Sequence, residues 1–385
     1  MEIRKNVAPE FVLGTGALNL AGRYAENLSA QKALIVTDPG LIAAGWVSKV
    51  TNSLSQSNVE SVVFSKVSPN PRDIEVMSGA ELLMSSGCDL IVAIGGGSPI
   101  DCAKGIGIVA TSGENILSFE GVDRIRIPGP PLICIPTTAG TAADISQFAI
   151  INDTARKVKI AIISKTMVPD VALIDPRTTT TMSADLTAAT GIDALVHAIE
   201  AYVSTARSPI TDLHALEAVR LVSTNLVQAI KRPDEMSHRD NMMLASVFAG
   251  LAFSNAGLGL VHAMAHSLGG LLDLPHGMCN ALLLEYVLEF NYSSAPERYA
   301  SLAKAFGVNV DGLSLSEQRI RFIEALYNLR KAVGLGHGFG ELGVKTENIP
   351  TLANYALNDP CVATNPVKPR LQDIEQIYER ALETR

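Results

Sequence analysis

The chain has 385 residues, of which 47% are hydrophobic and 18% are charged. This length and composition predict a folded protein with two domains and exclude a disordered chain. The net charge of −8, together with the lack of a lysine- or arginine-rich stripe, argues against nucleic acid as a partner.

Three features of the sequence bear on the compartment of the protein. The N-terminal residues MEIRKNVAPEF lack the apolar segment of a signal peptide. The most apolar stretch, 257–273, contains two histidines and four glycines and ends in Asp273, which favours a buried helix over a membrane span. The five cysteines form no C-x-x-C pair, and their odd number argues against a disulfide framework. We therefore expect a cytoplasmic protein with no membrane partner.

Between residues 30 and 180, short β-rich runs alternate with helical stretches such as 71–86 and 99–111. Strands joined by crossover helices are typical of a parallel sheet with helices on both faces. The predicted strands are 32–38, 59–65, 89–98, 131–138 and 171–175.

No β-rich run follows residue 183, and the rest of the chain shows helical periodicity. Ser183 is placed to cap the first helix of this half. The predicted helices include 208–232, 240–256, 316–334 and 371–383. The sequence therefore predicts an α/β N-terminal domain with a parallel sheet, residues 1–180, followed by an all-α C-terminal domain, residues 181–385.

A run of three glycines, Gly95–Gly97, follows the third predicted strand and precedes a helix that begins near Pro99. Glycine lets the backbone approach a ligand closely, and the N-terminus of a helix offers unpaired N–H groups to a phosphate. The motif is neither G-x-G-x-x-G nor a Walker A sequence. Glycines in such a turn are often structural, so the turn alone leaves both roles open.

Asp38 stands at the carboxyl end of the first predicted strand, where ligands of open α/β sheets bind. A carboxylate there can accept from a ribose 2′-hydroxyl and repels a 2′-phosphate, which favours NAD over NADP. The alternative is a turn-forming aspartate before Pro39. After the fourth predicted strand, Thr137, Thr138 and Thr141 offer hydroxyls to a ribose or a nicotinamide, although threonine-rich turns are common. This half is thus the candidate dinucleotide-binding domain.

Asp193 and His197 interrupt the apolar stretch GIDALVHAIE, residues 191–200. On a helix the two side chains share one face, with β-carbons roughly 5–6 Å apart. Two explanations remain open for such a pair: a simple hydrogen bond between acid and imidazole, or a metal ion that both side chains bind.

Further histidines stand in the same half of the chain. His262 and His266 are four residues apart in GLVHAMAHSLGG, and His276 begins a predicted helix after Pro275. One buried histidine is more often a satisfied core residue, but three motifs flanked by small residues favour a metal site. Imidazoles with one carboxylate and no thiolate suit Fe(II), Zn(II), Co(II) or Ni(II) and argue against a structural zinc knuckle.

These motifs resemble, in their order, the iron-dependent (group III) alcohol dehydrogenase family over nearly the whole chain. The resemblance is strongest to the branch of lactaldehyde:propanediol oxidoreductases and 1,3-propanediol dehydrogenases. The matching segments are PNP (69–71), GGGSPIDCAK (95–104), PTTAGTAAD (136–144), DTARKVKIAI (153–162), ATGIDALVHAIEAY (189–202), FSNAGLGLVHAMAHSLGG (253–270), PHGMCNA (275–281) and NDPCVATNP (358–366).

The resemblance implies roles for individual residues. It makes the helical domain a metal-binding and catalytic domain, with His266 near the nicotinamide as the catalytic candidate. The implied metal ligands are Asp193, His197, His262 and His276. The implied cofactor-binding residues are Asp38, Asn70, Gly96, Gly97, Ser98, Thr137, Thr138 and Lys159. The expected substrate pocket is partly apolar and includes Phe148, Phe253 and Cys361.

One departure from the family pattern stands in the threonine-rich turn. Many relatives have Gly-Ser-Glu where this chain has Ala142, Ala143 and Asp144. Another branch has Ala-Ala-Glu, so only the shorter acid is distinctive. We expect the departure to affect the neighbouring turn more than the reaction.

The implied activity is reversible, NAD-linked hydride transfer between a short primary alcohol or diol and its aldehyde, with a metal that polarises the substrate oxygen. Fe(II) is the favoured metal and Zn(II) the alternative. His266 either exchanges a proton with solvent or only shapes the nicotinamide pocket. Two other functions remain open: a hydroxyacid–oxoacid transhydrogenase, and a sensor or regulatory homologue without turnover. A homodimer or larger homo-oligomer is expected, and residues 9–18 could supply an edge strand to a partner.

Overall fold

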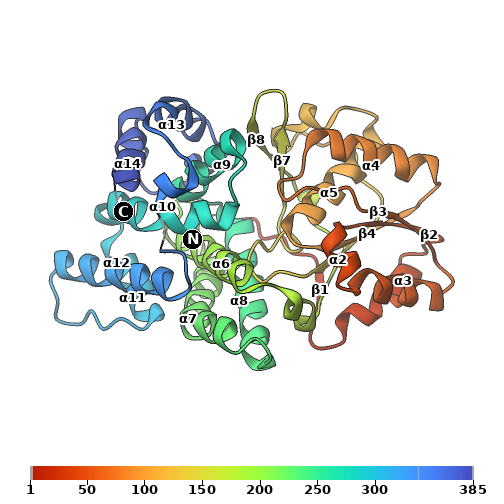
Figure 1. Ribbon diagram of the computed structural model, residues 1–385, viewed down its shortest axis with the longest axis horizontal. Helices are drawn as coiled ribbons and strands as arrows, with labels where there is room; N and C mark the ends of the chain where they lie inside the picture. The colour runs from red at the N-terminus through yellow and green to blue at the C-terminus, as the bar shows by residue number, and fades with distance from the viewer. Residues whose placement is uncertain (1–2, 337, 384–385) are drawn as a thin grey trace. The chain divides into compact units, whose positions relative to one another are not determined.

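The computed structural model describes residues 3–336 and 338–383 (Figure 1). Its contacts divide the chain into an α/β unit, Val7–Met182, and a helical unit that comprises Ser183–Arg385 and Met1–Asn6. The division falls close to the boundary expected near residue 180. The N-terminal segment, however, groups with the helical unit, where Arg4 Nη2 donates to the carbonyl of Thr205 at 3.2 Å.

The α/β unit is built on a six-stranded sheet in which every paired strand is parallel to its neighbour. In spatial order the strands are β1 (Glu10–Leu13), β9 (Val171–Ile174), β6 (Leu132–Pro136), β4 (Leu90–Gly95), β2 (Lys32–Val36) and β3 (Glu60–Phe64). The helices of this unit are α1 (Ala21–Asn27), α2 (Pro39–Ala43), α3 (Trp46–Gln56), α4 (Asp73–Ser85) and α5 (Gly97–Ser112). Its 3-10 turns are η1 (Ala17–Leu20), η2 (Ile116–Phe119), η3 (Lys165–Met167) and η4 (Pro176–Thr181). The parallel sheet predicted from the sequence is confirmed.

Alternating side chains along each strand fill two separate cores. Leu34 and Val36 of β2 belong to the core formed with α4 and α5. Ala33 and Ile35 of the same strand belong to the core formed with α1 and α3. Both faces of the sheet are therefore covered, as is usual for parallel sheets, and polar ligands are left to the strand ends.

A second, three-stranded sheet in this unit was not predicted. It consists of β5 (Gly121–Val122), β8 (Val158–Ile163) and β7 (Phe148–Asp153), and β7 pairs with β8 as an antiparallel hairpin. Phe148 and Lys159 lie on this hairpin. The departure at Ala142 falls on the segment just before it, where Ala142 has a φ of +47°. The chain thus keeps a left-handed turn residue at this position without glycine.

The second unit is helical, as predicted, and α6, α7 and α8 pack against one another within it (Figure 1). Its helices are α6 (Ala184–Val203), α7 (Pro209–Lys231), α8 (Met236–Ala256), α9 (Leu260–Leu272), α10 (His276–Asn291), α11 (Pro296–Phe306), α12 (Leu315–Ala332), α13 (Ile349–Leu357) and α14 (Leu371–Glu383). Its 3-10 turns are η5 (Tyr292–Ser294), η6 (Phe339–Leu342), η7 (Thr346–Asn348) and η8 (Pro360–Thr364). The side chain of Ser183 caps α6 as predicted, because its oxygen accepts from the backbone N–H of Leu186 at 3.1 Å.

Among the described residues, no single helix has the length and apolar composition needed to cross a membrane. The pair formed by α8 and α9 meets those requirements only together, and it is bent by 100° at the break between the two helices.

Candidate metal and nucleotide sites

Helix α6 carries the first two candidate ligands through a buried part of the helical unit. Asp193 and His197 are one turn apart, and their side chains face the same way, as the sequence predicts. Asp193 is 1% exposed and His197 is 4% exposed. A carboxylate in such a position needs a compensating charge or hydrogen bonds.

Two further helices bring the other candidates to the same point. Helix α9 begins just after Gly257, which has a φ of +74°, and it carries His262 in its first turn. Helix α10 begins at His276, directly after Pro275, as expected from the sequence. Gly257 thus ends α8 shortly before the helix that carries His262, and Pro275 directly precedes the helix that begins with His276.

The four candidate ligands converge on one oxygen atom. Asp193 Oδ1 lies 3.6 Å from Nε2 of His262, 3.6 Å from Nε2 of His276 and 3.9 Å from Nε2 of His197. Two ligands that are each about 2.1 Å from an ion lie about 3.4 Å apart at the tetrahedral angle. Asp193, His262 and His276 offer ligand atoms that all lie within 4.8 Å of one another, which suits one divalent cation. His197 Nε2 is the most distant of the three imidazole nitrogens from Asp193 Oδ1.

The charges around this point also favour a cation. Burial by itself raises the pKa of Asp193, but the imidazoles of His197, His276 and His262 outweigh burial and hold that pKa well below its usual range. Burial opposes a charge on His262, yet its contacts with Asp193 and Glu200 raise the pKa of His262 to about 9. The same carboxylates that attract a proton to His262 would attract a metal ion.

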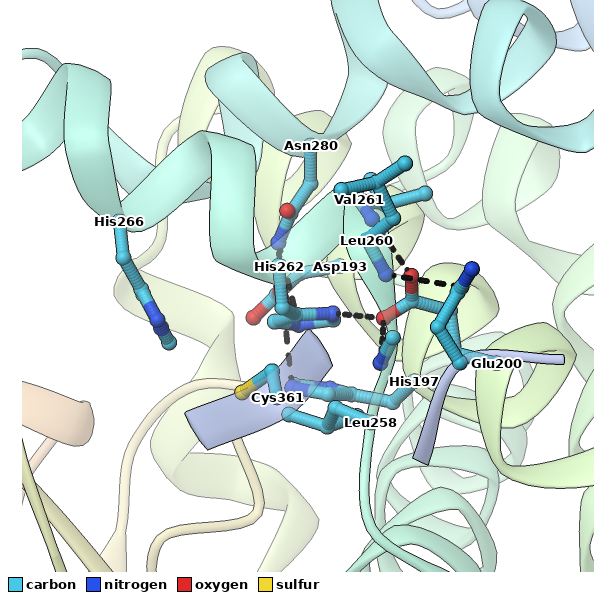
Figure 2. Close-up of polar contacts among 12 residues, drawn as sticks. Asp193, His197, Glu200, Leu258, Leu260, Val261, His262, His266, Asn280 and Cys361 are labelled. Atoms are coloured by element: carbon cyan, nitrogen blue, oxygen red, sulfur yellow. Dashed lines mark hydrogen bonds and ion pairs between the residues drawn. The ribbon is translucent and has the colours of Figure 1, made fainter. Parts of the chain in front are cut away.

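Two polar residues of this site escaped the sequence analysis. Asn280 Nδ2 donates to Asp193 Oδ1 at 2.6 Å and lies 3.2 Å and 3.3 Å from Nε2 of His276 and His262 (Figure 2). Glu200 Oε2 accepts from His262 Nδ1 at 2.6 Å. Helical spacing could have revealed both residues, because Asn280 is one turn from His276 and Glu200 is one turn from His197.

His266 is oriented differently from His262, although both lie on α9. Its Nδ1 donates to Asp359 Oδ2 at 2.8 Å, and its ring stacks on that of His276 with centroids 5.2 Å apart. The backbone N–H of Cys361 donates to the other oxygen of Asp359 at 2.8 Å. His266, Asp359 and Cys361 thus form a second buried cluster beside the four candidate ligands.

Phe253, a candidate pocket residue, stacks on the ring of His197 with centroids 4.3 Å apart. Cys361, another candidate, is 4% exposed, and burial raises the pKa of its thiol well above the usual range. Phe148, the third, lies on β7 of the α/β unit. Phe148 thus lies in a different unit from Phe253 and Cys361.

In the α/β unit, the glycine-rich turn joins β4 to α5 and packs against the threonine-rich turn. A β-carbon on Gly96 would lie 3.1 Å from Thr138, and one on Gly97 would lie 3.0 Å from Thr141. No side chain caps the start of α5, where Gly96 is the N-cap. Close backbone approach and an uncapped helix of 16 residues suit a pyrophosphate.

The other predicted cofactor contacts are spread over the same unit. Thr137 is buried, and its backbone N–H donates to Gly95 O at 2.9 Å. Ser98 Oγ donates to Pro69 O, which fastens the glycine-rich turn to the segment that contains buried Asn70. Lys159 lies on β8.

Asp38 has a structural role at the end of β2. It is the N-cap of α2, and its Oδ1 accepts from the backbone N–H of Leu41 at 3.1 Å, with Pro39 at the first helical position. This is the turn-forming role that the sequence left open. Recognition of a ribose by the same carboxylate remains a prediction.

A parallel α/β unit with a glycine-rich turn, followed by a helical unit with one buried carboxylate and three imidazoles, is the arrangement of a nucleotide- and metal-dependent enzyme. Residues 8–176 match the family described as "Iron-containing alcohol dehydrogenase", and residues 187–382 match its C-terminal part. The chain belongs to the iron-containing alcohol dehydrogenase family. This confirms the resemblance read from the motifs.

Individual proteins of known name or structure agree with this assignment. The chain is 42% identical to 1,3-propanediol dehydrogenase of Citrobacter freundii, over 96% of both chains. It is 40% identical to the NAD-dependent methanol dehydrogenase of Bacillus methanolicus, over 98% of this chain and 99% of the other. A crystal structure of 1,3-propanediol oxidoreductase superposes with a TM-score of 0.96, at 40% identity, over 99% of this chain and 100% of the other. The chain is thus an alcohol dehydrogenase of the iron-containing family.

Proposed function

We propose that the protein interconverts short primary alcohols or diols and their aldehydes, with NAD as the hydride acceptor and donor. The observation that carries this proposal is the convergence of three imidazole Nε2 atoms on Asp193 Oδ1 at 3.6–3.9 Å. The relatives named for 1,3-propanediol and for methanol support small hydroxyl substrates.

Asp193, His197, His262 and His276 would hold the metal, for which we propose Fe(II). Their spacing and chemistry fit a divalent cation, and the family is described as iron-containing. When bound, such an ion acts as a Lewis acid on the substrate oxygen. His276 has the most open side chain of the four, at 25% exposed, compared with 5% or less for the others. We therefore expect substrate to approach from the side of His276.

Gly96, Gly97 and Ser98 would bind the pyrophosphate of NAD, with Asn70, Thr137, Thr138 and Lys159 as further contacts. Asp38 would favour NAD over NADP. The nicotinamide supplies hydride chemistry, and the protein supplies the glycine backbone, the uncapped start of α5 and the threonine hydroxyls. A diagnostic consequence is a much higher KM for NADP than for NAD.

His266 would exchange the proton that accompanies hydride transfer. Asp359 holds the proton of His266 on Nδ1, because a carboxylate can only accept. This leaves Nε2 of His266 to accept or release a proton. Phe148, Phe253 and Cys361 would give the substrate pocket its apolar lining, which suits a short carbon chain.

The proposal also covers the state of the protein in the cell. The chain would be cytoplasmic, which is consistent with an odd number of cysteines, five, and no C-x-x-C pair among them. It would form a homodimer, because β1 is an edge strand whose outer side has no partner strand within the described residues.

The test is an anaerobic assay of freshly purified, metal-analysed protein. NADH formation is followed at 340 nm with a panel of short primary alcohols and diols, before chelation, after chelation, and after addition of Fe(II) or Zn(II). Activity that is lost on chelation and restored by metal is expected. Stoichiometric metal without free NADH would contradict the proposal. Oxoacid reduction driven by a hydroxyacid would then indicate a transhydrogenase, and no turnover would indicate a sensor.

A further inference from the structure

Glu200 is a buried carboxylate that accepts three hydrogen bonds at the start of α9 (Figure 2). Its Oε2 accepts from His262 Nδ1 at 2.6 Å and from the backbone N–H of Gly259 at 2.9 Å. Its Oε1 accepts from the backbone N–H of Val261 at 2.7 Å. One side chain of α6 therefore contacts both the backbone of α9 and an imidazole of the candidate metal site.

We propose that Glu200 is a positioning residue of the metal centre, which fixes the tautomer and the orientation of His262 and thereby sets the affinity for the metal. The inference rests on the proposed metal site. Glu200 does not touch the substrate or the metal in this account. It acts through His262.

The protonation of His262 follows from the chemistry of its partner. A carboxylate has no proton to donate, so Nδ1 of His262 must be the donor in the 2.6 Å contact. In a neutral imidazole, Nε2 then carries the lone pair, and this is the atom that lies 3.6 Å from Asp193 Oδ1. Without Glu200, the proton could move to Nε2, and the ring would present a donor to the cation.

Glu200 also fixes the backbone that leads into His262. Helix α9 begins at Leu260, after the N-cap residue Gly259, which has no side chain to cap it. The backbone N–H groups of Gly259 and Val261 donate to Glu200, and that of Leu260 donates to Asn365 Oδ1. A β-carbon on Gly259 would lie 2.8 Å from both side chains. The negative charge of Glu200 at this helix end is also favourable. His262, in the first turn, is therefore held by its ring and by its backbone.

Carboxylates that orient metal-binding histidines typically contribute 10–100-fold to metal affinity. The first test replaces Glu200 with glutamine (Glu200→Gln), which keeps the shape and an acceptor oxygen but removes the charge. Its affinity for Co(II) and Zn(II) is measured by chelator competition, without NAD or alcohol. We expect about 10–100-fold weaker binding and a changed visible absorption spectrum of the Co(II) form.

Two control variants separate positioning from structural support. Asn365→Ala removes the side-chain oxygen that accepts from the backbone N–H of Leu260 at the start of α9. It leaves the hydrogen bond between Glu200 and His262 in place. Glu285→Gln changes another buried glutamate of the unit, which is paired with Arg330 at 2.9 Å. Both should lower thermal stability but leave the metal affinity and the Co(II) spectrum unchanged.

The outcomes distinguish the inference from the proposed function. If Glu200→Gln binds Co(II) as tightly as the wild type with the same spectrum, or if the controls weaken binding equally, the positioning role of Glu200 is wrong. If the wild type binds no divalent cation, the proposed function itself fails. If Glu200→Gln does not fold, Glu200→Asp is used instead, because its side chain is one methylene shorter and its carboxylate lies farther from His262. Its metal affinity and its Co(II) absorption spectrum are then compared with those of the wild type.

Discussion

The four-residue spacing of His262 and His266 predicts that they share one face of a helix, but the two side chains have different partners in the structure. Nε2 of His262 faces Asp193, whereas Nδ1 of His266 donates to Asp359. Both Nδ1 atoms have a carboxylate partner, but His266 groups with Asp359 and Cys361, whereas His262 groups with Asp193 and His276. Residues with identical spacing thus divide into a candidate ligand and a candidate proton carrier.

The first prediction concerns His266. His266→Ala should keep a full equivalent of metal and lower kcat by about 10²–10⁴-fold, the usual contribution of a general acid or base. Metal analysis and steady-state kinetics measure the two effects. His214→Ala, which alters a half-buried histidine stacked on Phe248, is the matched control and should leave kcat unchanged. Loss of metal in His266→Ala would make His266 a ligand instead.

The second prediction concerns Asp144, the distinctive acid of the threonine-rich turn. Burial raises the pKa of Asp144 to about 6, against the opposing effect of its backbone hydrogen bond and of Lys104. Since the pKa is higher in the folded than in the unfolded protein, the free energy of unfolding falls as pH rises from about 4 through 6. In Asp144→Asn the side chain has no carboxyl group, so no buried negative charge forms as the pH rises. The stability of this variant relative to the wild type should therefore increase by roughly 2–3 kcal/mol between pH 4 and 7.

Thermal unfolding of both proteins across this pH range measures the effect. A difference in melting temperature that favours Asp144→Asn increasingly at higher pH is the expected result. A difference that does not vary with pH would show that Asp144 titrates in the same range in the folded and unfolded protein.

At the scale of elements, α5 is tied to β7 by buried polar groups. Lys104 on α5 is 3% exposed, and its Nζ donates to the carbonyls of Ser146 and Phe148 at 2.8 Å and 2.6 Å. Asp101 Oδ2, on the same helix, accepts from the backbone N–H of Ile150 at 3.1 Å. These bonds fasten the helix of the glycine-rich turn to the segment that follows the threonine-rich turn.

The third prediction follows from this connection. Lys104→Met keeps the length of the side chain but leaves two buried carbonyls without their donor, at a cost of about 1–3 kcal/mol. We expect a lower melting temperature and a several-fold higher KM for NAD, with metal content unchanged. Lys165→Met, at an exposed lysine of the same unit, is the control. An unchanged KM for NAD in Lys104→Met would show that the turn holds its shape without this lysine.

The elements also show what the sequence could predict. Apolar runs bounded by glycine, proline and aspartate located β2, β3, β4, β6 and β9, because buried parallel strands are continuously apolar. The hairpin of β7 and β8 was missed, since β8 lies largely within a motif that was read only for cofactor contacts and β7 lies in the stretch before it, which was assigned no element. Local patterns therefore located five of the six strands of the main sheet but not the small one. The sixth strand, β1, lies within residues 9–18, which were expected to supply an edge strand to a partner and which pair with β9 of the same chain.

The candidate site was predictable where its residues share a helix turn. Asp193 with His197, and His262 with His266, are visible from spacing alone. Glu200, one turn beyond His197, could have been found in the same way, although its contact with His262, 62 residues away, could not. Asp359 was missed because its partner His266 is 93 residues away. Such long-range partners depend on helix packing, which spacing does not encode.

At the scale of the whole molecule, the chemistry is divided between two units. The helical unit supplies the four candidate ligands and the His266–Asp359 pair, and the α/β unit supplies the glycine-rich turn. A divalent cation held by Asp193, His197, His262 and His276 would link this fold to alcohol oxidation.

The most direct measurement is anomalous X-ray diffraction at the metal absorption edge, from crystals of the Fe(II)- or Zn(II)-loaded protein with NAD. We expect one strong anomalous peak within about 2.0–2.2 Å of a carboxylate oxygen of Asp193 and of the three histidine Nε2 atoms. A peak at the cluster of His266, Asp359 and Cys361, with none at Asp193, would contradict this expectation.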